Sequence, residues 1–108
     1  MNDSPLGVFE EQVLVAVLRT WNEAYGMNVR RELENVTGRD PAIGAVYATL
    51  DRLEAKGLVA SARKLVDGQS RRVFAVRRAG LLALAETRRM RERLWRGIDL
   101  AGLLASDT

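Results

Sequence analysis

The chain has 108 residues and a mass of 12.0 kDa, the size of one compact domain, and its 47% hydrophobic and 29% charged residues are typical of a folded globular protein. It contains no His and no Cys, which excludes disulfides, thiolate nucleophiles and the usual ligands of zinc, copper and haem, and makes an enzyme the least favoured class of function. The net charge of +3 is a weak indication of a polyanionic partner.

Two amphipathic helices are predicted in the first third of the chain. From Val8 to Trp21, apolar residues recur at spacings of three and four, the period of a helix with one buried face. Residues 22–26 interrupt this pattern, and a second apolar stripe ends at Thr37-Gly38, where glycine suits the left-handed residue that closes a helix. The second stripe consists of Val29, Leu33 and Val36.

A third helix is predicted from Pro41, which is acceptable in a helix's first turn, to Gly57, which ends it. At 100° per residue, one side of this helix is apolar and is expected to be buried; it holds Ile43, Val46, Thr49, Leu50 and Leu53. The outward side is small and almost uncharged, whereas a merely solvated helix face is rich in Lys and Glu. It holds Gly44, Tyr47, Ala48 and Asp51, with Arg52 at its margin.

A β-hairpin is predicted between Leu58 and Val76, because strand-forming residues flank the turn dipeptide Asp67-Gly68. A two-residue turn pairs Val66 with Gln69 and Val59 with Val76, and it sets like charges opposite each other twice, Lys64 with Arg71 and Arg63 with Arg72. Directly opposed like charges destabilise a hairpin, so we expect these four cations to lie together and to face a polyanion.

The charge distribution agrees with this interpretation. Residues 1–60 carry six Lys or Arg against nine Asp or Glu, residues 61–78 carry six against one, and residues 79–108 carry five against four. At the level of composition, a solvated basic face and a phosphate-binding patch explain the cluster about equally well.

One long helix of about 25 residues is predicted from Ala79 onward, where Leu84, Thr87, Met90, Leu94 and Ile98 keep a three-four spacing. It is too long for the remaining core to cover. Either its outer end is solvated, or it packs on the same helix of a second subunit; we favour a homodimer, because an exposed Trp beside Leu and Ile is unfavourable. The interface residues are then Met90, Leu94, Trp95, Ile98 and Ala101, while the arginines at 88, 89, 91, 93 and 96 form a solvated, ion-paired face.

Three helices followed by a hairpin is the order of a winged helix-turn-helix, a mostly α fold in which the third helix enters the major groove and the wing follows the DNA backbone. The residues over 6–80 also resemble the PadR family of bacterial transcriptional regulators. The resemblance is carried by LGVFEEQVLVAVL (6–18), AYGMNVRRELE (24–34), GAVYATLDRLEAKGLV (44–59), RRVFAV (71–76) and Ala79-Gly80. We therefore expect a winged helix-turn-helix domain at 6–78 and a C-terminal dimerisation helix at 79–105.

The resemblance implies a homodimeric repressor that binds double-stranded DNA at a palindromic operator, with half-sites about 34 Å apart. It also implies a small-molecule effector at the dimer interface in some members, so Trp95 either lines a ligand pocket or simply anchors the dimer. The chain departs from the family in its short wing tip, residues 65–70, and in having Arg77-Arg78 where a Thr commonly caps the last helix.

Each candidate DNA-binding residue has a functional and a structural interpretation. Tyr47 either contacts a phosphate or sugar or packs on the second helix, and Gly44 and Ala48 either admit the DNA backbone or serve helix packing. Arg52 reaches a phosphate or a guanine, or it pairs with an acidic neighbour, Glu32 or Glu54. Most of the affinity is expected from Arg63, Lys64, Arg71 and Arg72, whereas Asp51 has no assigned role.

Two functions of different classes therefore remain: a DNA-binding transcriptional regulator and a dimeric winged-helix protein-interaction module that binds no DNA. The basic wing favours the regulator, because a docking module has no need of opposed like charges. The sequence has no basic signal region and no apolar run that could cross a bilayer, so we expect a cytoplasmic protein with no metal, no cofactor and no membrane contact.

Overall fold

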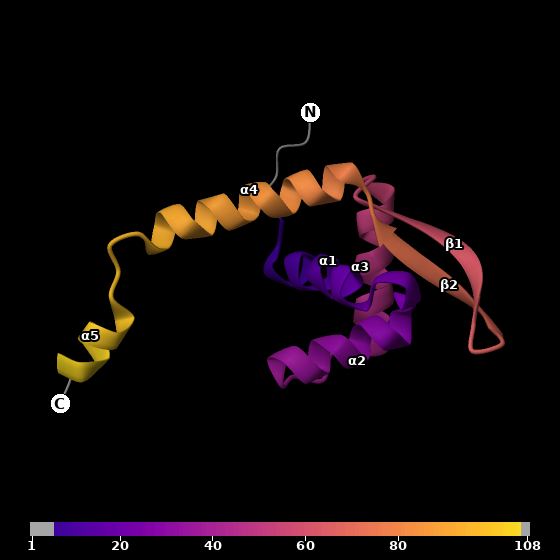
Figure 1. The fold of residues 1–108 in the computed structure, drawn as a ribbon, viewed down its shortest axis with the longest axis horizontal. Coiled ribbons are helices and arrows are strands. Elements are labelled where there is room, and N and C mark those ends of the chain that lie inside the picture. Colours follow the sequence, from indigo (N-terminus) through magenta and orange to yellow (C-terminus); the bar gives the residue numbers. More distant parts are fainter. Residues whose placement is uncertain (1–5, 107–108) are drawn as a thin grey trace.

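The computed structural model describes residues 6–106, in which a two-stranded hairpin extends from one side of a group of helices (Figure 1). Helices α1, α2 and α3 and the hairpin form a head, and α4 crosses α1 and projects away from it. The elements are α1 (Val8–Thr20), the 3₁₀ turn η1 (Trp21–Glu23), α2 (Gly26–Thr37), α3 (Ile43–Ala55), β1 (Val59–Val66), β2 (Gln69–Val76), α4 (Arg78–Trp95) and α5 (Leu100–Ser106).

The core of the head forms where the predicted apolar stripes meet. The stripes of α1, α2 and α3 converge, and Phe74 of β2 is the largest fully buried side chain. The prediction is wrong for Val36, the last residue of the second stripe, which is exposed near the end of α2. The buried aliphatic residues are Val13, Leu14, Val17, Val29, Leu33, Val46, Leu50, Leu53 and Val59. Thr49 is buried as predicted. This is the mostly helical winged-helix architecture predicted from the sequence.

The ends of α2 and α3 test the predicted helix boundaries. Gly38 closes α2 in the left-handed conformation, with φ of 73°, as predicted. The prediction that Pro41 occupies the first turn of α3 is wrong. The carbonyl of Ala42 accepts the first helical bonds, whereas that of Pro41 accepts from Nε of Arg30 at 3.0 Å, so the helix begins at Ile43.

The hairpin has the predicted register: Val59 pairs with Val76, Arg63 with Arg72, Lys64 with Arg71 and Val66 with Gln69. Asp67 and Gly68 have φ of 51° and 79°. Two successive positive φ values give the turn a backbone twist that matches the twist of the strands. The turn dipeptide therefore fixes which residues of the two strands face each other.

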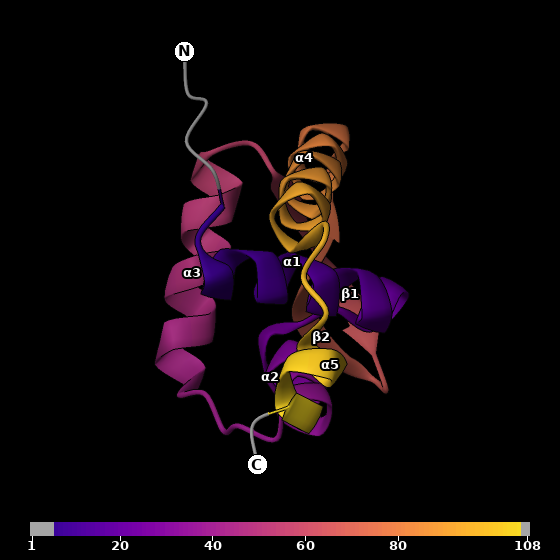
Figure 2. The same ribbon diagram turned by 90° about the vertical axis from the view of Figure 1, so that its left-hand side faces the viewer.

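The prediction of one continuous C-terminal helix is wrong, because the helix breaks after Trp95. Gly97 adopts a φ of 82°, which ends α4, and the carboxylate of Asp99 accepts from the backbone N–H of Gly102 at 3.1 Å and opens α5. All side chains from Glu92 to Ser106 are exposed. Residues 78–106, which include α4 and α5, are called the arm here, and Figures 1 and 2 show α5 at its outer end.

The arm is held to the head at the beginning of α4. Gly80 is buried so close to β1 that a Cβ there would lie 2.4 Å from the carbonyl oxygen of Leu58. Leu84 packs on the core, and Thr87 is buried. Within the described residues, no helix is long and apolar enough to cross a membrane.

Candidate nucleic-acid interface

The outward face of α3 is as small as the sequence predicts. Gly44, Ala48 and Asp51 are exposed, and no atom outside the helix lies within 4 Å of the place a Cβ would take on Gly44. Ala55, one turn beyond Asp51, continues this surface and was not among the predicted residues. These four residues, here called the α3 outer face, leave room for another molecule to approach the helix backbone.

Tyr47 does not point freely outward. A Cβ on Gly26 would lie 2.3 Å from its Cζ and 2.5 Å from its hydroxyl oxygen, so the Tyr47 ring covers the first residue of α2. The side chain is still 38% exposed. The ring therefore packs on the second helix, as the structural interpretation expects, and the residue remains accessible, so its contact with a phosphate or sugar stays a prediction.

Arg52 pairs with neither predicted partner. Its Nε lies 3.6 Å from Oε2 of Glu10, and its Nη2 donates to the hydroxyl of Thr49 at 3.3 Å. Glu10 is itself buried and accepts from Nζ of Lys56 at 2.8 Å; this hydrogen bond is the main cause that holds the pKa of Glu10 below its ordinary value. Arg52 thus belongs to the edge of α3 that faces α1.

The four cations of the hairpin do not lie together, which corrects the prediction. Neighbouring residues on a strand point to opposite faces, so the pair Arg63 and Arg72 lies on one face and the pair Lys64 and Arg71 on the other. The first pair shares its face with Phe74, which is buried in the core. The second shares its face with Val73, which bridges to Tyr25 ahead of α2.

Arg72 bridges the hairpin and α3. Its Nη1 lies 2.9 Å from Oδ1 of Asp51, its Nη2 lies 2.5 Å from Oε1 of Glu54, and its Nε donates to Ser61 Oγ at 3.2 Å. Its guanidinium also lies 4.7 Å from the centroid of the Phe74 ring. Hydrogen bonds from Ser61 and then from Arg72 lower the pKa of Glu54. Arg72 is therefore occupied by protein carboxylates rather than available for phosphate.

The other three hairpin cations have fewer protein partners. Arg71 lies over the ring of Tyr25 at 4.6 Å and donates to Gln69 Oε1 at 2.7 Å, and Lys64 donates to Asn22 Oδ1 at 3.1 Å. Arg63 is exposed and makes no ion pair with any residue of 6–106. Tyr25 and Asn22 were missed by sequence reasoning, because only the tertiary fold brings η1 and the residue before α2 beside the hairpin.

The predicted dimer residues lie along the arm. Met90 is half-buried, whereas Leu94 is 68% exposed, Trp95 53% and Ile98 52%, and Ala101 is also exposed. The predicted ion-paired arginine face holds for Arg88 and Arg89, which lie beside Glu92 and Glu86. It does not hold for Arg91, which forms a two-pronged ion pair with Glu11 of α1, its Nη2 2.5 Å from the carboxylate.

Comparisons with known proteins agree with this architecture. The model of the transcriptional regulator PadR-like family matches residues 14–86. The transcriptional regulator Rv3488 of Mycobacterium tuberculosis is 43% identical over 77 residues, which is 71% of each chain.

Two solved structures have the same fold. A Streptococcus transcriptional regulator is 23% identical, with a TM-score of 0.72 over 84% of this chain and 88% of that one. A PadR-like transcriptional regulator of Bacillus cereus is 20% identical, with a TM-score of 0.69 over 94% of each chain.

Proposed function

This chain belongs to the PadR-like family of transcriptional regulators and is not an enzyme, and from this premise we propose that it is a homodimeric repressor that binds DNA directly. The observation that carries the proposal is the α3 outer face, small and accessible, beside a hairpin whose basic residues exceed its acidic ones. A docking module explains the first feature but not the second.

In the proposed complex, the α3 outer face enters the major groove. Gly44 and Ala48 let the helix backbone approach the bases, and Asp51 is the one side chain of this face that can hydrogen-bond to a base edge. Direct base recognition is then sparse. We expect operator preference to depend strongly on DNA shape and on the spacing of the half-sites.

Phosphate contacts supply most of the affinity in this proposal. Arg63 is the best placed of the hairpin cations, since its charge is not neutralised by a carboxylate. Lys64 and Arg71 have only neutral partners and can add to the positive field. The Tyr47 hydroxyl lies over the first turn of α2, where the backbone N–H groups of a helix N-terminus favour an anion.

Dimerisation through the exposed apolar residues of the arm sets two heads on one DNA molecule, which implies a palindromic operator. Trp95 and its neighbours are then buried between the subunits, and a small apolar effector that binds there would alter the separation of the heads. A repressor of this kind acts where the chromosome is, in the cytoplasm.

The test is binding to the DNA upstream of the protein's own gene, measured by fluorescence anisotropy at two salt concentrations. Ala48→Glu adds a carboxylate to the α3 outer face and is expected to weaken binding by at least about tenfold. Asn35→Glu adds the same charge at an exposed position of α2 and serves as the control. Absence of wild-type binding at low salt, or equal effects of the two substitutions, would contradict the proposal.

A further inference from the structure

Asp51 is the one charged residue of the α3 outer face. The other three residues of this face, Gly44, Ala48 and Ala55, have no side chain larger than a methyl group, and all four are exposed. The short side chain of an aspartate reaches a base only if the helix backbone comes close to the groove, and these small neighbours permit that approach. Asp51 is therefore in a position to contact a base edge.

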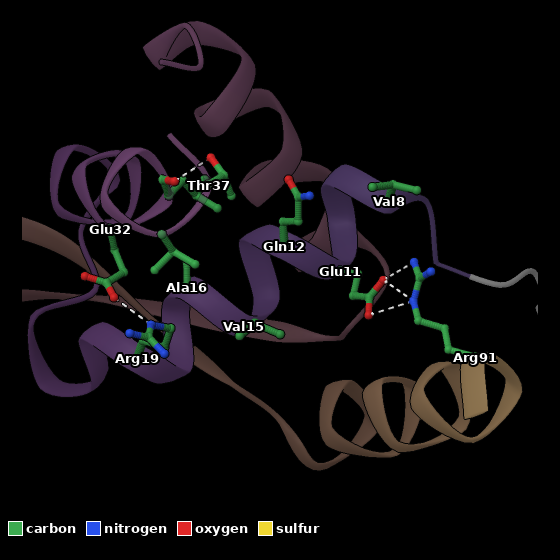
Figure 3. A pocket seen from close by; sticks show the side chains of 11 residues that line it. Val8, Glu11, Gln12, Val15, Ala16, Arg19, Glu32, Thr37 and Arg91 are labelled. Carbon is green, nitrogen blue, oxygen red and sulfur yellow. Dashed lines mark hydrogen bonds and ion pairs between the residues drawn. The ribbon is translucent and has the colours of Figure 1, made fainter. Parts of the chain in front are cut away.

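The exposure of Asp51 distinguishes it from the carboxylates that serve packing. Two ion pairs line the groove between α1, α2 and α4 (Figure 3), and their carboxylates, Glu11 and Glu32, have side chains only 22% and 23% exposed. The Asp51 side chain is 59% exposed, and Arg72 is its one ion-pair partner among residues 6–106. A carboxylate has two oxygens that accept several hydrogen bonds, so Asp51 keeps acceptor capacity toward another molecule.

Arg72 orients the Asp51 carboxylate from the side of the wing. Its Nη1 lies 2.9 Å from Oδ1 of Asp51, while Nη2 lies 2.5 Å from Oε1 of Glu54 and the guanidinium lies over the Phe74 ring. Glu54 is held in turn by the hydroxyl of Ser61, which donates to Oε2 at 2.8 Å. A group that is already oriented loses less conformational freedom when it binds. The positive charge of Arg72 also offsets the repulsion between Asp51 and DNA phosphates.

The hydrogen-bonding chemistry of a carboxylate selects among the bases. A carboxylate accepts hydrogen bonds and donates none. In the major groove, guanine presents the acceptors N7 and O6 and thymine presents O4, so neither offers a donor. The donors are N4 of cytosine and N6 of adenine, but adenine also presents the acceptor N7 beside its amino group, which opposes a carboxylate. Cytosine is therefore the base that suits Asp51.

We propose that Asp51 determines specificity at one base pair of each half-site by accepting a hydrogen bond from N4 of a cytosine, and that Arg72 positions the carboxylate for this contact. The inference rests on the DNA binding proposed above and names the base that α3 recognises. One such contact should favour the cytosine over each other base at that position by at least about fivefold in affinity.

The test is a selection of binding sites from duplexes with randomised half-sites, followed by anisotropy titrations with each of the four base pairs at the selected position. Wild type should favour cytosine there, and Asp51→Ala should abolish this preference while preferences at other positions persist. Asp51→Asn should shift the preference toward adenine, because a carboxamide accepts from N6 and donates to N7. Asp40→Asn removes the same charge from another exposed aspartate, which pairs with Arg30, and should leave the preference unchanged.

Arg72→Ala tests the positioning role, since it should reduce the preference for cytosine without creating a preference for another base; an unchanged preference would contradict that role. Thermal melts establish that each variant is folded. Two outcomes overturn the inference: wild type binds DNA but favours cytosine at no position, or Asp51→Ala keeps the wild-type preference. Absence of DNA binding by the wild type contradicts the proposed function itself, whereas binding without an Asp51-dependent preference contradicts only this inference.

Discussion

Arg63 and Arg72 face each other across the hairpin, yet their side chains have different surroundings. Arg63 is exposed, whereas Arg72 holds Asp51 and Glu54 in ion pairs. Both carboxylates lie along the side of α3 that faces the wing. We therefore propose a phosphate contact for Arg63 and a positioning role for Arg72, which ties the wing to α3 and would mask two negative charges beside bound DNA.

These roles predict different salt dependences. Arg63→Ala should weaken binding to all DNA sequences and lower the slope of log K against log salt by about one, because one phosphate contact is lost. Arg72→Ala should weaken binding without that loss of slope, because the side chain contacts carboxylates. Anisotropy titrations over a range of salt concentrations measure both slopes.

The masking role has its own test, in which Asp51→Asn is added to Arg72→Ala. Removing the unpaired carboxylate should restore part of the lost affinity, and the same substitution should matter less in the wild-type background, where Arg72 already neutralises it. Strictly additive effects of the two substitutions on binding would show that Arg72 does not act through Asp51.

The contributions of the Tyr47 ring and of its hydroxyl can be measured separately. Tyr47→Phe keeps the ring over Gly26, so the melting temperature should not change, while the loss of a hydrogen bond to a phosphate should weaken binding about tenfold. Tyr47→Ala should lower both stability and affinity, since it uncovers the start of α2. A Phe variant that binds DNA like the wild type would leave Tyr47 a purely structural residue.

At the scale of elements, Glu10 joins the beginning of α1 to the end of α3. Its Oε1 accepts from the backbone N–H of Gly7 at 2.9 Å, while its Oε2 accepts from Lys56. One carboxylate thus caps a helix and forms a tertiary ion pair. This contact links α1 to α3, the helix that carries the α3 outer face.

The lowered pKa of Glu10 predicts how this contact responds to acid. A carboxyl whose pKa falls on folding stabilises the protein fully above its ordinary value of 4.5, and the stabilisation is lost as the pH falls through the lowered pKa. Glu10→Gln should therefore reduce the free energy of unfolding by about 1–2 kcal/mol at neutral pH. Thermal melts from pH 7 down to about pH 3 should show the gap between variant and wild type closing in acid; a constant gap would contradict the assignment.

At the scale of the whole molecule, the arm is the part that we propose holds two chains together. The head has a closed core, whereas every apolar residue of the arm from Glu92 to Ser106 is exposed. A protomer is therefore half of the proposed binding unit, and DNA affinity should depend on dimerisation through the effective concentration of the second head.

Leu94→Asp tests this dependence by placing a charge in the middle of the proposed interface. We expect a monomer by sedimentation, a head that melts as in the wild type, and DNA affinity reduced by about a hundredfold. Leu65→Asp is the matched control for oligomeric state, because it adds the same charge at an exposed leucine of the wing. If Leu94→Asp remains dimeric, the arm does not form the interface at that residue.

Local chemistry explains why much of the fold could be predicted. Apolar spacing marked α1, α2 and α3, Gly38 marked the end of α2, and Asp67-Gly68 fixed the register of the hairpin to the residue. The prediction of one continuous C-terminal helix was wrong at Gly97, because the three-four spacing of apolar residues continues past the break that Gly97 and the Asp99 cap make in the backbone.

The sequence by itself determined the winged-helix order, the small outer face of α3 and the opposition of like charges across the hairpin. Only the tertiary structure decided that Arg72 is occupied by Asp51 and Glu54, that Arg52 turns to Glu10 and that Tyr47 covers Gly26. Periodicity and turn residues act over a few positions and can be identified along the chain. Side-chain partners from different elements depend on how the helices and the hairpin pack in three dimensions.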